Sequence, residues 1–143
     1  MNDKVRVGIL LDLTSDNKLE RSMIIEALRD PDRAGLNATE AWFGTDPAEL
    51  PDAPSFDLLV FDYGALHHAY GDTKLHWTRS VERWCEDHPG KLALAYSAFT
   101  SLIIDELRTE LGEVPDNLVM LYETGRQLDQ NPEAWQMIRS WYG

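Results

Sequence analysis

Short apolar runs alternate with amphipathic segments along the chain. Five nearly continuous apolar runs of four to eight residues predict strands that are buried on both faces, as in a parallel sheet. These runs cover residues 5–11, 37–43, 56–61, 91–96 and 118–122. Apolar residues at helical spacing predict helices between them and after the last one. The helices are expected at residues 19–28, 77–88, 100–111 and 132–142.

Strands that alternate with helices predict parallel pairing through right-handed crossovers. We therefore expect a three-layer α/β/α domain with a five-stranded parallel sheet in the flavodoxin-like order 2-1-3-4-5. One crossover departs from the pattern, because residues 44–55 contain Pro47, Pro51 and Pro54 and leave room for only one short turn of helix. The 143 residues are expected to form a single domain, 1–143, since two halves would be too small to bury good cores.

The chain is strongly acidic, with 13 basic and 25 acidic residues and a formal net charge of −12. This charge argues against direct nucleic-acid binding and against docking on an anionic membrane. No apolar run approaches the length of a membrane span, and residues 1–6 lack the features of a secretory signal. The single cysteine excludes an internal disulfide, so we expect a cytoplasmic protein.

Polar side chains follow the strands at the edge where parallel α/β sheets bind their ligands. Asp12 ends the first predicted strand, Asp62 ends the third and Ser97 ends the fourth, with Asp16 and Glu123 nearby in the sequence. Neighbouring carboxylates repel each other unless they share a cation or a proton. An all-oxygen set favours Mg²⁺, which Asp12 and Asp62 would hold, with Asp16 as a further candidate ligand. The alternative is that these acids only end strands and cap loops, and that no cofactor binds. No nucleotide or flavin motif follows the first strand, and no such cofactor is expected.

This pattern resembles the receiver domains of bacterial two-component response regulators. The matching residues are Asp12 after the first strand, Asp62 after the third, and Ser97-Ala98 after the fourth. The resemblance implies that Asp12 is a metal ligand, that Asp62 accepts a phosphoryl group, and that Ser97 is the hydroxyl that contacts it. It covers most of the chain in element order, although its motifs are only three short matches.

The sequence also departs from the receiver pattern. Receivers carry two adjacent acids after the first strand, whereas Asp12 is followed by Leu13. Receivers carry Lys-Pro after the fifth strand, whereas this chain has Glu123-Thr124. A negative charge in place of that lysine would repel a phosphoryl group. These departures indicate a degenerate receiver, or pseudo-receiver, that has lost phosphotransfer. The alternative is that the three matches reflect only a shared fold.

Two further segments are candidates for recognition. The loop from Tyr63 to Asp72 is chemically mixed, and its residues Tyr63, His67, His68 and Tyr70 are candidate interaction residues because loops over a sheet edge commonly carry function. A metal role for the adjacent histidines is disfavoured by their spacing.

The last helix is rich in aromatic residues, and Trp135, Trp141 and Tyr142 are candidate interaction residues. Part of this aromatic surface must pack on the sheet, and any exposed part favours a protein–protein contact. In receivers the last two helices and the last strand form the usual dimer face. Cys85 lies on the apolar face of its helix and is expected to be a buried, inert thiol.

Three functional hypotheses follow. The first is a non-enzymatic, receiver-like regulatory module that binds another protein or a second copy of itself. The second is a Mg²⁺-dependent phosphoacceptor or small hydrolase that uses Asp12, Asp62 and Ser97. The third is an acidic decoy that occupies the basic groove of a nucleic-acid-binding protein, which requires the acids to lie in a stripe on one face.

Overall fold

A computed structural model of the chain describes residues 4–11, 17–62, 72–97, 109, 115–122 and 132–142. Five parallel strands form one sheet in the order β2-β1-β3-β4-β5, which confirms the predicted topology. The strands are β1 (Lys4–Leu10), β2 (Asn37–Gly44), β3 (Leu58–Asp62), β4 (Leu92–Ser97) and β5 (Leu118–Tyr122). Each begins within two residues of its predicted start, and the largest shift is at β3, where Phe56 precedes the strand rather than opening it.

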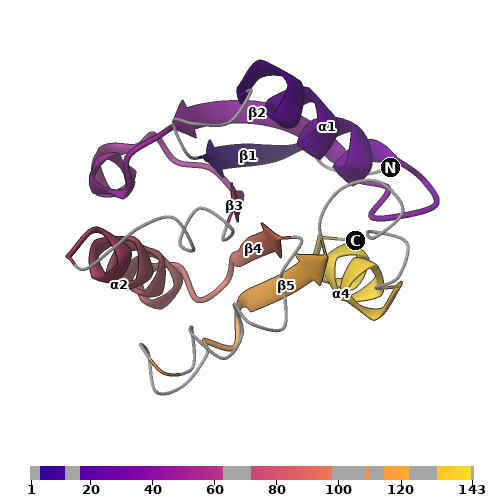
Figure 1. Ribbon diagram of the computed structural model, residues 1–143. Coiled ribbons are helices and arrows are strands. Elements are labelled where there is room, and N and C mark those ends of the chain that lie inside the picture. Colours follow the sequence, from indigo (N-terminus) through magenta and orange to yellow (C-terminus); the bar gives the residue numbers. More distant parts are fainter. Residues whose placement is uncertain are drawn as a thin grey trace.

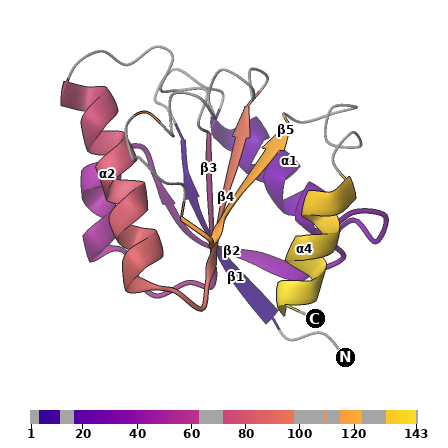
Figure 2. The same cartoon turned by 90° about the horizontal axis from the view of Figure 1, so that it is seen from below.

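Helices cover both faces of the sheet, so the expected three layers are present (Figure 1). The helices α1 (Asn17–Arg29) and α4 (Pro132–Tyr142) pack on one face, and α2 (Asp72–Asp87) packs on the other, as Figure 2 shows from below. Alternate side chains of β3 point to the two layers: Leu58 and Val60 join the core under α1 and α4, and Leu59 joins the core under α2. Of the helix expected at 100–111, the structure describes only Thr109, which is helical.

The β2–β3 crossover is short, as its prolines predicted. It contains η1 (Pro47–Asp52), a 3₁₀ helix of six residues. The side chain of Asp46 caps this helix by accepting a hydrogen bond from the backbone N–H of Ala48 at 2.9 Å. The chain then runs without regular structure to β3, and the ring of Phe56 turns inward onto the sheet, where it is 3% exposed. The six-residue η1 therefore covers only part of the flank of α2 that a full crossover helix would shield.

The last turn of α4 is attached to the amino-terminal edge of the sheet by hydrogen bonds from three side chains. The guanidinium of Arg139 donates to the carbonyl oxygens of Pro31 and Arg33. The indole N–H of Trp141 donates to Gly90 O at 2.9 Å. The hydroxyl of Tyr142 donates to Asp57 O at 2.7 Å and accepts from the backbone N–H of Leu92 at 3.2 Å.

Tyr142 makes the stability of the fold sensitive to alkaline pH. Burial of the hydroxyl, with a smaller contribution from the charge of Asp57, raises the pKa of Tyr142 from 10.0 to about 12. Above pH 10 the unfolded chain loses this proton while the folded chain keeps it. The part of the free energy of unfolding that comes from this hydroxyl is therefore fully present below pH 10. It is lost as the pH rises towards 12, at up to about 1.4 kcal/mol per pH unit.

We expect the free energy of unfolding, measured by urea titration between pH 9 and 12, to fall less steeply in Tyr142→Phe than in the wild type. At neutral pH the variant should lose about 1–2 kcal/mol, because the N–H of Leu92 loses its acceptor. If the free energy of unfolding fell equally steeply with pH above pH 10 in both proteins, the Tyr142 hydroxyl would not be the cause of the loss of stability at alkaline pH.

Candidate functional site

The candidate phosphoacceptor residues lie at the carboxyl ends of two neighbouring strands. Asp62 is the last residue of β3 and pairs in register with Tyr96 of β4. Ser97 is the next residue and the last of β4, where it pairs with Tyr122 of β5. The backbone thus brings Asp62 and Ser97 to the same edge of the sheet, at adjacent strand ends, as their sequence positions predicted.

The other residues predicted for this edge fall outside the described residues. These are Asp12, Asp16 and Glu123, together with the loop residues Tyr63, His67, His68 and Tyr70. Within the part of the chain that the structure describes, no three His, Cys, Asp or Glu side chains are grouped so that they could hold a metal ion. The magnesium site therefore remains a prediction from the sequence.

The three aromatic residues of the last helix have different environments. Trp135 is only 5% exposed and packs in the core under α4, so its prediction as an interaction residue is wrong: a side chain enclosed by the sheet cannot contact a partner. Tyr142 is partly buried, and its hydroxyl is engaged within the chain. Trp141 is 38% exposed, and Met137, one helical turn earlier, is 39% exposed. Trp141 and Met137 are therefore two exposed apolar side chains on the otherwise polar outer side of α4.

Cys85 is a buried thiol on the inner side of α2, as expected. Burial, with smaller contributions from the charges of Glu86 and Glu82, raises the pKa of Cys85 to about 12. The thiolate is the reactive form of cysteine, and it is scarce at neutral pH when the pKa is this high. Cys85 is therefore a core residue and not a nucleophile.

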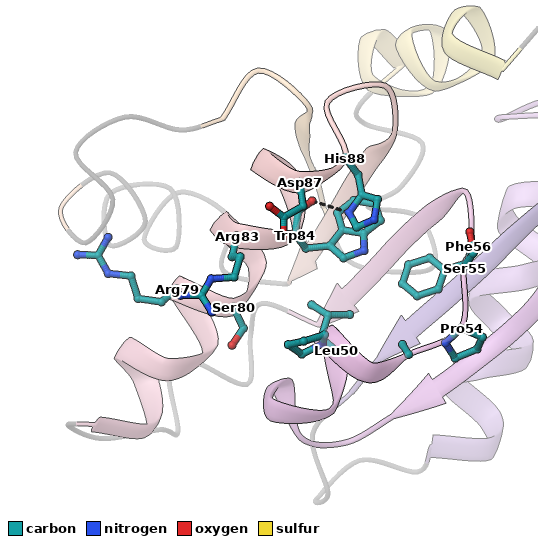
Figure 3. Close-up of a pocket in the computed structure, with 12 residues that line it drawn as sticks. Leu50, Pro54, Ser55, Phe56, Arg79, Ser80, Arg83, Trp84, Asp87 and His88 are labelled. Carbon is teal, nitrogen blue, oxygen red and sulfur yellow. Dashed lines mark hydrogen bonds between the residues drawn. The ribbon is translucent and has the colours of Figure 1, made fainter.

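A groove of about 390 Å³ lies between η1 and α2 (Figure 3). Its floor includes Leu50, Phe56 and Trp84, which are all buried hydrophobic residues. Arg79 and Arg83 line it from α2. Because α2 runs back from the carboxyl edge of the sheet to the start of β4, residues 79–88 lie towards the opposite edge from Asp62 and Ser97. We call this space the α2 groove.

A column of stacked rings supports the floor of the α2 groove. Phe56 stacks on Trp42 with ring centroids 5.9 Å apart and on Trp84 with centroids 5.6 Å apart. The imidazole of His88 lies beside Trp84, with ring centroids 4.8 Å apart and the rings tilted by 30°. Its Nδ1 donates to the carbonyl oxygen of Trp84, which can only accept, at 2.9 Å. The column therefore connects β2, the β2–β3 crossover and the end of α2.

The sequence-based search did not identify the α2 groove. Two signals in the sequence could have indicated it. The prolines of residues 44–55 predict a shortened crossover, and a shortened crossover leaves part of the next helix uncovered. Arg79 and Arg83 lie four residues apart and therefore share one side of that helix. The sequence alone does not connect these two signals, because the wall of the groove opposite α2 comes from residues 50–56, in a different part of the chain.

Comparisons with known proteins support the fold and identify no sequence relative. No model of a protein family matches the chain, and no curated protein matches it either. Solved structures do match. The signal receiver domain of a two-component response regulator from Bacteroides fragilis is 12% identical with a TM-score of 0.53, over 94% of this chain and 97% of that chain.

Two further structures align over nearly the whole chain. The RcsB response regulator from Salmonella typhimurium is 14% identical with a TM-score of 0.54, over 98% of this chain and 67% of that chain. A protein named as an adenylate cyclase from Rhodopirellula baltica is 14% identical with a TM-score of 0.53, over 98% of this chain and 90% of that chain.

The sheet order and the position of the candidate edge define a flavodoxin-like α/β domain. Within that class, the chain resembles the receiver domains of response regulators. At these identities the likeness establishes the fold, and function must be argued from the residues of this chain. In the described part of the chain no helix is both long enough and apolar enough to cross a membrane.

Proposed function

We propose that this chain is a non-enzymatic, receiver-like regulatory module of the cytoplasm that acts through protein contacts and does not transfer phosphoryl groups. The observation that carries this proposal is the combination of a receiver fold with an altered set of edge residues. Asp62 and Ser97 end adjacent strands, as a phosphoacceptor and its hydroxyl partner should. The other residues that phosphoryl transfer requires in receivers are different in this chain.

Two changes act against phosphoryl transfer. The position after β5 that carries lysine in receivers is Glu123 in this chain, so a cation that would attract the phosphoryl oxygens is replaced by an anion. In a partly buried site this substitution costs a few kcal/mol. After β1 a single acid, Asp12, is followed by Leu13, which removes one oxygen ligand for Mg²⁺. The Mg²⁺-dependent phosphoacceptor is therefore the weaker candidate.

The outer side of α4 is the surface that we assign to protein contact. Met137 and Trp141 are exposed there one turn apart, and the hydrogen bond from Trp141 to Gly90 O fixes the indole on the surface. A tryptophan held in one orientation loses little conformational entropy on binding, which suits an interface anchor. By analogy with the dimer face of receivers, we propose that a second copy of this chain docks on α4 and forms a weak homodimer.

The test is sedimentation equilibrium of the full chain over a range of concentrations. We expect a mass between those of monomer and dimer for the wild type, and an association constant at least about tenfold lower for Trp141→Gln. Leu19→Gln is the matched control, since Leu19 is 57% exposed on α1 and lies outside the proposed surface. A wild type that stays monomeric at every concentration would contradict the dimer.

The acidic-decoy hypothesis is not supported by the positions of the described acids. Glu20 and Glu26 lie on α1, whereas Glu82 and Glu86 lie on α2, and these helices cover opposite faces of the sheet. Acids on both outer layers do not form the one-sided stripe that mimicry of a nucleic acid requires.

A further inference from the structure

The α2 groove has the construction of a ligand site. Its volume of about 390 Å³ falls within the range of small-molecule pockets, roughly 300–1,000 Å³. Such pockets are mainly apolar, with a few polar groups that orient the ligand. The groove is open because η1 provides six residues where a full helix would cover α2.

The floor of the groove is a fixed apolar surface. Phe56 stacks nearly parallel on Trp42 and on Trp84, at interplanar angles of 8° and 11°. Its carbonyl oxygen accepts a hydrogen bond from the ammonium of Lys91 at 2.7 Å, which attaches this part of the crossover to the start of β4. Leu50 is buried within η1. A preformed floor needs no reordering when a flat apolar group binds.

The side of the groove formed by α2 carries cationic groups. The guanidinium of Arg79 is 3.4 Å from both carboxylate oxygens of Glu82, a long and exposed ion pair. The exposed Arg83 has no ion-pair or hydrogen-bond partner in the described part of the chain. Asp87 also lines the groove and contributes one negative charge. The chain has a net charge of −12, so an arginine without an ion-pair partner beside aromatic side chains sets this groove apart from the mostly acidic surface.

We propose that the α2 groove binds a small molecule consisting of an aromatic or other flat apolar group that carries a carboxylate. The apolar group would lie against the exposed Pro51 and Pro54, which line the groove above its buried floor. The carboxylate would pair with Arg83, whose planar guanidinium suits two parallel hydrogen bonds to a carboxylate. This site is separate from the strand edge that holds Asp62 and from the outer side of α4, so the proposal stands independently of the proposed function.

The test uses three probes of one shape and different charge: 2-naphthoate, 2-naphthylmethanol and 2-naphthylmethylammonium. Each is titrated into the full ¹⁵N-labelled chain, and amide shifts are followed by NMR. We expect 2-naphthoate to shift residues 50–56 and 79–88 saturably. The neutral alcohol should bind about fivefold more weakly, since an exposed ion pair contributes up to about 1 kcal/mol, and the ammonium should bind more weakly still.

Two variants that each lose one positive charge distinguish an ion pair between Arg83 and the probe carboxylate from an effect of the protein's overall charge. Arg83→Gln should remove the preference for 2-naphthoate over the alcohol, whereas Lys18→Gln, on α1 across the sheet, should keep it. No saturable shifts at the groove, or equal binding of carboxylate and alcohol by the wild type, would overturn the proposal. Binding of an acidic, aromatic peptide at the groove without binding of 2-naphthoate would also overturn it in favour of a protein partner.

Discussion

Asn117→Asp is expected to lower the free energy of unfolding by about 3–5 kcal/mol, a large share of the roughly 5–15 kcal/mol that stabilises a typical domain. Asn117 is 7% exposed and lies immediately before β5. Its amide nitrogen is within hydrogen-bond distance of three carbonyl oxygens, those of Cys85, His88 and Lys91, at 3.0, 3.1 and 2.9 Å. These carbonyls follow the last turn of α2 into β4.

The size of the effect follows from what an aspartate would face. All three partners of the amide nitrogen are carbonyl oxygens, so the carboxylate oxygen in its place would meet acceptors where it needs donors. It would have to stay charged and unpaired or take up a proton on folding. Asn117→Ala removes the donor without adding charge and should cost about 1–3 kcal/mol.

The measurement is urea denaturation of the wild type, Asn117→Asp, Asn117→Ala and a neighbouring control. Asp116→Asn is the control, because Asp116 is exposed and the substitution should change stability by less than about 0.5 kcal/mol. The aspartate variant should also regain part of its stability at low pH, where its carboxyl group is protonated. If Asn117→Asp were as stable as Asp116→Asn, Asn117 would not be holding the end of α2 to the sheet.

Gly8→Ala is expected to destabilise the fold by about 2–3 kcal/mol, near the upper end for overpacking by a single methyl group. A Cβ atom at Gly8 would lie 2.6–2.7 Å from three ring carbons of Phe56, well inside van der Waals contact. The ring cannot move aside easily, because it is buried and stacks on both Trp42 and Trp84. The clash would therefore displace the whole column and the floor of the α2 groove.

Gly90→Ala provides the matched control, since a Cβ there would have no atom within 4 Å. Thermal or urea denaturation should place Gly90→Ala within about 0.5 kcal/mol of the wild type. A double variant, Gly8→Ala with Phe56→Leu, should be more stable than the sum of the two single losses predicts, because the smaller side chain relieves the clash. Strict additivity would mean that Gly8 and Phe56 do not constrain each other.

Regular alternation of apolar segments was sufficient to predict the sheet. Each strand is a short local run, and a buried parallel strand is apolar on both faces, so its position follows from the local sequence. The order of the strands was predicted from the fold class that alternating strands and helices indicate. The prolines of the β2–β3 crossover act on the local backbone and predicted the short η1 equally well. The strand-end position of Asp62 and Ser97 followed from the same patterns.

Features that depend on distant segments were not predicted. Asn117 acts on carbonyls that lie 26 to 32 residues earlier in the sequence. The clash that requires glycine at position 8 comes from Phe56, which no local pattern relates to it. Trp135 was assigned to a surface because composition alone does not distinguish the inner side of α4 from its outer side, where Trp141 lies.

We expect that this chain has a receiver fold but does not accept a phosphoryl group. Intact-mass spectrometry of the full chain after incubation with acetyl phosphate and Mg²⁺ tests this directly, with a phosphorylatable receiver treated in parallel. We expect the mass of this chain to stay unchanged while the receiver gains one phosphoryl group. A gain of one phosphoryl group that is abolished by Asp62→Asn would contradict the claim and identify Asp62 as a working phosphoacceptor.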